Sequence, residues 1–346
     1  MQIWVFHNAA RYAWVGADGT VILWDYAGCE FLSAHNRFVT ETRPSIGTDA
    51  FVAGSRSREM AKRLAAEIAD VARSAGGRSP RIAVDRINVV SMLALQDLGI
   101  EIGNGQEVME EARRIKSDDE IRAMRCAVHA CEATMEDLSE ALEPGMTERQ
   151  VWSVLHAGNI ARAGEWIETQ ILSSGPRTNP WFQEASSRVI EDGDVVAYDT
   201  DLVGAYGMMV DISRSWVAGD APPDCRALTA YDLAREQIDC NLELLRPGVT
   251  YRELTHNAWF PPTDDYRYYT CLFHGVGQCD EVPDIYFPHQ WEDSGYDGVV
   301  EPGMVMTVEA YVGSRDGGEG IKLEDQVLIT DTGHELLTEF SLDFKG

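Results

Sequence analysis

Apolar and polar positions in the first hundred residues alternate between two periods. SREMAKRLAAEIADVARSAG, at 57–76, repeats its apolar residues at helical spacing and ends in glycine, so it predicts an amphipathic helix. RYAWVG and TVILWDY, on either side of Ala17-Asp18-Gly19, predict two strands and a turn, and MQIWVF predicts a strand before them. RIAVDRI predicts a short buried strand, and SMLALQDLG predicts a short helix. This alternation predicts a small α/β domain over residues 1–110.

A second domain, over residues 111–346, is predicted to begin with a long helix. Ser117 and Glu120 have the spacing of a capping box, in which each side chain bonds to the backbone of the other residue. The apolar residues that follow are spaced by three and four positions, as on the core-facing side of a helix: Ile121, Met124, Val128, Cys131, Met135, Leu138 and Leu142. The pattern predicts one long helix that packs against the core of this domain.

The second domain contains an internal repeat. LEPGMTERQV at 142–151 resembles LRPGVTYREL at 245–254, and both predict a Pro-Gly turn followed by a capped helix. IEDGDVVAYD at 190–199 resembles VEPGMVMTVE at 300–309, so that Asp199 matches Glu309. In each half a second strand with an acid follows, at Asp211 and Glu324. Short matches of this kind also arise by chance, but the Pro-Gly turn, the capped helix, the acidic strand and the second acidic strand recur in the same order, which favours a duplication. The fold class is therefore predicted as α+β, with two halves related by a pseudo-twofold axis.

The acidic residues of the two halves are predicted to converge on a metal site. Asp199 and Asp201 are two positions apart, which places both on one face of a strand. Carboxylates gathered in a core cannot stay ionised and unpaired, and a pair of divalent cations resolves the conflict. Such sites commonly include a histidine, and His274, before Gly275-Val276-Gly277, is the best candidate. The alternatives are solvated turn acids and a core histidine. The predicted set is Asp199, Asp201, Asp211, His274, Glu309 and Glu324.

Charge along the chain is strongly uneven. The net charge is −28; residues 1–115 have 13 Lys+Arg against 14 Asp+Glu, and residues 116–346 have 16 against 43. Such an acidic surface repels phosphate backbones and acidic membranes, so we expect neither nucleic acid nor membrane partners. No apolar run approaches 18 residues, and no signal peptide is recognisable. The seven scattered cysteines without a C-x-x-C pair indicate reduced thiols, and hence a cytoplasmic protein.

The order of these motifs resembles the pita-bread family, which includes creatinase, methionine aminopeptidase, prolidase and aminopeptidase P. IKSDDEIRAMRCA resembles the entry into its catalytic domain, and GDVVAYDTD, VDISRSW, FHGVG, PGMVMTVEA and GIKLEDQVLITDTG resemble its five ligand segments. The resemblance implies two divalent metal ions, with Fe, Mn, Zn or Co equally suited. In the family's peptidases the first two aspartate ligands are eleven positions apart. Asp199 and Asp201 lie twelve and ten before Asp211, so either or both could coordinate.

Two positions depart from the peptidases in this family. The peptidases have a histidine 17 residues before the first aspartate ligand and another seven after the ligand histidine, and here these positions hold Phe182 and Glu281. YDTDLVGAYGMMVDISR, SSGPRTNPW and HGVGQCDE instead resemble one branch, the pita-bread dimethylsulfoniopropionate lyases. The resemblance implies a metal-dependent carbon–sulfur lyase that forms acrylate and dimethyl sulfide by β-elimination.

The residues suit that reaction. We predict that Asp280, six residues after His274, is the catalytic base. Its nearest competitor, Glu281, has the alternative role of a solvent-facing loop acid. Aromatic side chains would attract the sulfonium substrate, a small molecule, by cation–π contact, although each could instead be ordinary core. The candidates for substrate binding are Trp181, Phe182 and Tyr269, with Tyr268 beside them.

Other interpretations of the sequence stay open. The runner-up is a dinuclear-metal Xaa-Pro-type aminopeptidase or dipeptidase, and a third is a non-catalytic domain that binds a partner. The resemblance identifies residues 1–110 as a creatinase-type N-terminal domain and implies a homodimer. Met1-Gln2-Ile3-Trp4 resembles the middle of such a domain, so one interpretation is that this domain is shortened.

Overall fold

A computed structural model describes residues 11–76 and 80–344. The chain divides into two compact units, Met1–Glu110 and Glu111–Gly346. The predicted strand MQIWVF lies outside the described residues. Within the described ranges, none of the helices has the length and apolar character needed to cross a membrane.

The first unit is a small α/β assembly. Strands β1, β2 and β3 form one sheet, and β4 and β5 pair in parallel. An alanine-rich face of α2 packs with Ala94 and Leu95 of α3 in a common hydrophobic cluster. The helix predicted over 57–76 and the predicted hairpin are both present. The elements are β1 (Tyr12–Val15), β2 (Val21–Asp25), β3 (Glu41–Pro44), α1 (Ala50–Ala53), α2 (Ser57–Gly76), β4 (Arg81–Val84), α3 (Val89–Asp97) and β5 (Glu101–Asn104), followed by α4 (Gly105–Arg114), whose residues fall in both units.

The second unit combines helices with short and long antiparallel strands. Its helices are α5 (Asp118–Ala141), α6 (Glu148–Ala161), α7 (Cys225–Leu242), α8 (Tyr251–Asn257) and α9 (Trp291–Ser294). Its strands are β6 (Trp166–Ile167), β7 (Leu172–Ser174), β8 (Val195–Asp199), β9 (Leu202–Val203), β10 (Met209–Val210), β11 (Ser213–Val217), β12 (Tyr266–Arg267), β13 (Phe273–Val276), β14 (Asp280–Ile285), β15 (Val305–Ser314), β16 (Ile321–Ile329) and β17 (His334–Leu336).

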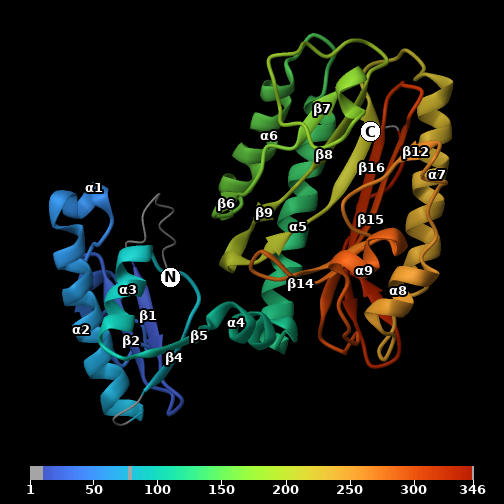
Figure 1. Ribbon diagram of the computed structural model, residues 1–346. Coiled ribbons are helices and arrows are strands. Elements are labelled where there is room, and N and C mark those ends of the chain that lie inside the picture. Colours follow the sequence, from blue (N-terminus) through green and yellow to red (C-terminus); the bar gives the residue numbers. More distant parts are fainter. Residues whose placement is uncertain (1–10, 77–79, 345–346) are drawn as a thin grey trace. The chain divides into compact units, whose positions relative to one another are not determined.

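The predicted repeat is visible in the local geometry of this unit. Thr147 and Thr250 both cap a helix through a capping box, and each also bridges to the segment that leads into its acidic strand, at Val189 and Val299 respectively. The first acidic strand, β8, lies between β7 and β11, and the second, β15, lies between β13 and β16. In Figure 1, α5 and α6 lie on one side of these strands and α7 lies on the other.

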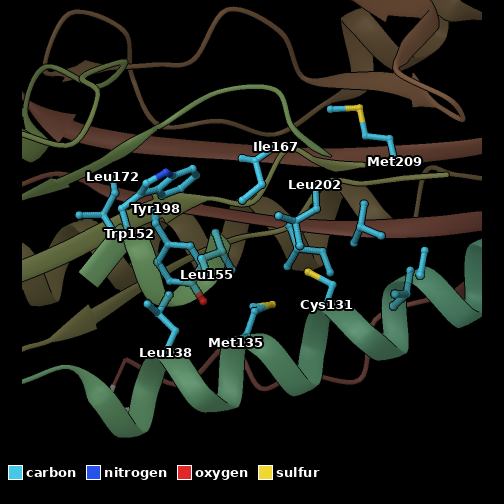
Figure 2. Close-up of a cluster of buried hydrophobic side chains, with 14 of the residues drawn as sticks. Cys131, Met135, Leu138, Trp152, Leu155, Ile167, Leu172, Tyr198, Leu202 and Met209 are labelled. Atoms are coloured by element: carbon cyan, nitrogen blue, oxygen red, sulfur yellow. The ribbon is translucent and has the colours of Figure 1, made fainter. Parts of the chain in front are cut away.

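Two hydrophobic clusters hold the helices against the strands. Five of the seven apolar positions predicted at three- and four-residue steps are buried in α5, and the first and last, Ile121 and Leu142, are partly buried. Figure 2 shows Cys131, Met135 and Leu138 directed from α5 toward Tyr198 and Leu202. The Ser117–Glu120 capping box starts this helix as predicted. The other cluster packs α7 against β15 and β16. Polar residues of β15 and β16 that alternate with these core residues therefore face the other side of the hairpin.

Candidate metal centre

The six predicted metal-ligating residues lie close together. Their donor atoms fall into overlapping groups, each with all of its atoms within 4.8 Å of one another. One group joins Asp199, Asp201 and Asp211, and another joins Asp211 to His274 and Glu324. A third joins His274 and Glu309 to Cys271, a buried thiol that the sequence analysis did not single out.

The two glutamates come from neighbouring strands of one long hairpin. Glu309 in β15 and Glu324 in β16 are direct cross-strand partners. Their neighbours Val308, Ala310 and Leu323 pack into the cluster with α7, and the pleat therefore turns both glutamates to the opposite face. Both side chains are almost fully buried.

The aspartates are placed less regularly than predicted. Asp199 is the last residue of β8 and pairs with Ser213, but the strand ends there and Asp201 has φ of 40°. The prediction that Asp199 and Asp201 share a strand face is therefore wrong, because the backbone leaves the extended region between them. Asp201 still turns toward the group and accepts a hydrogen bond from Thr169 Oγ1. Asp211 lies between β10 and β11, and its backbone N–H donates to Gln326 Oε1 at 3.1 Å.

His274 stands at the centre of the group. Its Nε2 lies 3.1 Å from Glu309 Oε1, 3.4 Å from Asp211 Oδ2 and 3.7 Å from Glu324 Oε1. It is the second residue of β13, and the pairing with β14 is irregular between His274 and Gly275. A side chain at Gly275 would collide with the backbone of β14, so this close approach requires glycine.

A buried lysine, which the sequence analysis did not anticipate, is part of the same group. Lys322 Nζ lies 2.7 Å from Glu309 Oε2, 2.9 Å from Glu324 Oε2 and 3.4 Å from Asp199 Oδ2. It also donates to Ser213 Oγ at 2.7 Å, and Ser213 Oγ in turn donates to Glu324 Oε2. The ammonium is fully buried and belongs to β16, two positions before Glu324.

Protonation at the site reflects a shortage of positive charge. Burial raises the pKa of Asp201 and Asp211 well above its usual range, and burial together with the charge of Glu324 raises the pKa of Glu309 to about 8. Burial also opposes ionisation of Glu324, but the Lys322 ammonium and hydrogen bonds with His274 and Glu309 together outweigh it and lower the pKa of Glu324. Burial acts against the charged form of His274 too, yet Glu309 and Glu324 raise its pKa.

The donor set fits a divalent metal centre. Buried oxygens of Asp199 (Oδ1), Asp211 (Oδ1) and Glu324 (Oε1) have no hydrogen-bond partner among the described residues. A buried acceptor without a donor is costly, and a cation that these oxygens share would satisfy all three. Carboxylate oxygens with one imidazole nitrogen suit divalent transition metals.

Asp280 and Glu281, the two acids after the histidine, point in different directions. Asp280 begins β14; its side chain is 68% exposed, with Oδ1 3.8 Å from His274 Nδ1. Glu281 is 5% exposed, and its Oε2 lies 2.7 Å from Lys116 Nζ. The alternative role of Glu281 as a solvent-facing loop acid is therefore wrong, because strand alternation turns it into the protein, where it meets a buried cation.

Aromatic residues line a pocket of about 260 Å³ next to the acidic group. Phe182, 56% exposed, stacks on Tyr269 with ring centroids 5.5 Å apart, and the ammonium of Lys322 lies 4.6 Å from the Tyr269 ring. Trp181 is largely buried and stacks on Tyr311. All of these except Lys322 line the pocket, as does Tyr268, which hydrogen-bonds to His289. The candidate substrate residues therefore line one pocket, together with Arg267 and Arg315.

Comparison with known proteins adds a family and close relatives. The model of metallopeptidase family M24 matches residues 122–331. The dimethylsulfoniopropionate lyase DddP of Roseovarius nubinhibens is 47% identical over 99% of this chain and 78% of its own length, and that of Roseobacter denitrificans is 44% identical with the same coverage. A prolidase structure from Pyrococcus horikoshii superposes with a TM-score of 0.76 at 22% identity, covering 96% of this chain and 89% of the prolidase, a likeness of fold alone.

Proposed function

This chain belongs to metallopeptidase family M24, and we propose that within the family it is a metal-dependent lyase that cleaves dimethylsulfoniopropionate to acrylate and dimethyl sulfide. The observation that carries the proposal is the match to lyases of that name at 47% and 44% identity over nearly the whole chain. The substrate is accordingly a small zwitterion with a sulfonium group and a carboxylate.

Charge balance supports a pair of divalent ions at the site. The five carboxylates of Asp199, Asp201, Asp211, Glu309 and Glu324 carry five negative charges when ionised, and Lys322 offsets one of them. The remaining four negative charges equal the charge of two divalent cations, with His274 neutral as a ligand. When bound, such ions would supply the positive charge that stabilises the carboxylate of the substrate as its α-carbon loses a proton.

The proposed reaction needs one base and no acid. The carboxylate of Asp280 takes the proton from the α-carbon, the electrons of that C–H bond form the double bond to the β-carbon, and the electron pair of the β-carbon–sulfur bond leaves with dimethyl sulfide. Asp280 Oδ1 lies close to the ligand His274 without being part of the group, and its exposure leaves it open to substrate. Burial and the nearby carboxylates raise the pKa of Asp280 in the metal-free chain, and bound divalent cations would favour the ionised form that a base requires.

The aromatic wall suits the sulfonium end. Phe182 and Tyr269, stacked on one another, both line the pocket, and a cation over an open aromatic face is stabilised by about 0.5–2 kcal/mol. Peptide hydrolysis has less support, because Phe182 cannot transfer a proton and the Glu281 carboxylate is bound to Lys116. A homodimeric assembly and a cytoplasmic location stay predictions.

Gas chromatography of the headspace above purified, metal-loaded protein tests the proposal. We expect dimethyl sulfide from dimethylsulfoniopropionate and negligible cleavage of Xaa-Pro or Met-Xaa peptides. Asp280→Ala should lower turnover by about 10²–10⁴-fold with unchanged metal content, because only the base is lost. The exposed Asp293→Ala is the matched control. Turnover of a proline dipeptide without dimethyl sulfide would overturn the lyase assignment, and loss of metal from Asp280→Ala would make Asp280 a ligand.

A further inference from the structure

Glu281 is held by more partners than a structural loop acid needs. Its Oε2 lies 2.7 Å from Lys116 Nζ, and its Oε1 lies 3.4 Å from Arg113 Nε and accepts the backbone N–H of Gln278 at 2.9 Å. The side chains of Glu281 and Lys116 are 0% and 2% exposed. Removing one partner of a buried pair of this kind is strongly destabilising, so the contact resists local opening.

These contacts fix the turn between the ligand histidine and Asp280. A side chain at Gly277 would collide with the Glu281 carboxylate, so the carboxylate packs directly on the backbone of the turn. The N–H of Gly277 donates to Cys279 O at 3.1 Å, and Gly277 O accepts the N–H of Met209 at 2.8 Å. The turn is thus held from one side by the ion pair and from the other by the strand that precedes Asp211.

The cation of this pair is itself anchored to the long hairpin. The backbone N–H of Lys116 donates to Gly303 O at 2.9 Å, and the N–H of Gly303 donates to Ile329 O at 2.9 Å. Gly303 precedes β15 by two residues, and Ile329 is the last residue of β16. The ammonium that meets Glu281 is therefore tied to the same hairpin that carries Glu309 and Glu324.

Asp280 lacks such support of its own. Within the described ranges its side chain accepts no hydrogen bond, and its close neighbour is His274 Nδ1 at 3.8 Å. Asp280 and Glu281 are adjacent in β14 and lie on opposite faces, opposite Val276 and Gly275 of β13 respectively. The backbone alone sets where the Asp280 carboxylate stands, and Glu281 holds that backbone in place.

We propose that the Lys116–Glu281 ion pair, assisted by Arg113, is a positioning clamp that aims Asp280 at the substrate. The inference rests on the proposed role of Asp280 as base. Neither member of the clamp touches substrate or metal ligands; both act by keeping the turn at 277–280 in one conformation. A displacement of about 1 Å in a catalytic group can cost about 10²-fold in rate, which is the scale of effect that such a clamp controls.

A double-mutant cycle on the full-length, metal-loaded protein tests the clamp. Lys116→Met should lower kcat for dimethyl sulfide release by roughly 10- to 100-fold, with KM within about twofold and metal content unchanged. In an Asp280→Ala background, the same substitution should have no further effect, because its target is already absent. Arg125→Met, which breaks the exposed pair with Glu335, is the control and should leave kcat unchanged in both backgrounds.

The outcomes separate this inference from the proposed function. Equal losses in both backgrounds, or no loss in either, would overturn the clamp and leave the lyase assignment intact. An Asp280→Ala enzyme as fast as the original would remove the base itself, and the clamp with it. If Lys116→Met does not fold, Glu281→Gln keeps the side-chain shape and the acceptor for Gln278, and the same pattern of non-additivity is expected from it.

Discussion

The two hairpins that carry the acidic residues differ in the length and content of their ladders. The first, β8 with β11, has five residue pairs and stops at Asp199–Ser213, whereas the second, β15 with β16, has eight and continues past Glu309–Glu324. Two positions beyond Glu309–Glu324, the second hairpin places Tyr311 opposite Lys322. In the first hairpin, the residues two positions beyond the Asp199–Ser213 pair are two acids, Asp201 and Asp211.

The negative charge of the buried carboxylates is neutralised differently in the two halves. In the second half an ammonium stands within 3 Å of both glutamates, so part of the neutralising charge belongs to the chain. In the first half the equivalent position is a third aspartate, and the pKa values of Asp201 and Asp211 are raised by burial and by neighbouring carboxylates. The first half therefore depends on a bound cation to a degree that the second does not.

The largest expected effect is the loss of activity on replacing Asp211, a proposed metal ligand, compared with Ser213, the residue that pairs with Asp199. Asp211→Ala should remove a metal ligand and lower lyase turnover by more than the 10–100-fold that loss of a supporting group typically costs. Ser213→Ala alters the residue that occupies the ladder position of Glu324, and should keep the metal content with affinity reduced by roughly tenfold. Elemental analysis with turnover measurements checks both. Metal loss from Ser213→Ala with retention in Asp211→Ala would reverse the comparison.

A smaller effect is expected on the stability of the metal-free protein. Lys322→Met removes the cation from a buried group, and we expect the free energy of unfolding to fall by about 3–5 kcal/mol in denaturant titrations. Arg252→Met, which breaks an exposed pair with Asp297, is the control and should cost at most about 1 kcal/mol. If the two variants were equally stable, the Lys322 ammonium would not be what neutralises the second hairpin.

A further effect concerns the pH dependence of stability. A carboxyl group whose pKa is higher in the folded than in the unfolded protein binds more protons when folded, so stability falls as pH rises between the two values. For Glu309 these values are 4.5 and about 8, and Asp201 and Asp211 act in the same direction. The metal-free protein should therefore lose stability as pH rises from about 5 to about 8. Glu324, with its lowered pKa, opposes this only below 4.5.

Metal should reverse or flatten this dependence, because cations bind the ionised carboxylates. Thermal denaturation across this pH range, with and without a divalent ion, measures the difference. A metal-free protein whose stability rises steadily over the same range would show that the first hairpin is neutralised by groups of the chain itself.

Local sequence patterns predicted much of the architecture. The helix over 57–76, the capping boxes at Thr147 and Thr250, and the α+β pita-bread class, which the family and structural comparisons confirm, followed from periodicity, turn residues and resemblance. The convergence of the six candidate ligands also followed from the repeat. These features are local or repeat within the chain, and so leave a signal in one sequence.

What the sequence did not predict depends on tertiary register. Lys322 lies in a strand among apolar residues. Because lysine is so rarely buried, a lysine at such a position predicts an exposed side chain. Glu309 pairs with another acid across its hairpin, Glu324, whereas Asp199 pairs with Ser213, because the first strand ends at Asp199. The spacing of the acids along the chain does not reveal this difference in pairing. The burial of Glu281 was not predictable for a similar reason, because its partner Lys116 is 165 positions away in the chain.

The burial of Lys322 also bears on the chemical reactivity of the protein. The chain has only four lysines, at 62, 116, 322 and 345, and two of them are enclosed next to carboxylates. Amine acylation needs an accessible, neutral nitrogen, so native protein should be labelled at the exposed Lys62 and spared at Lys116 and Lys322. Because the chain otherwise uses arginine, which such reagents do not attack, labelling at these two sites provides a built-in chemical reporter for opening of the catalytic core.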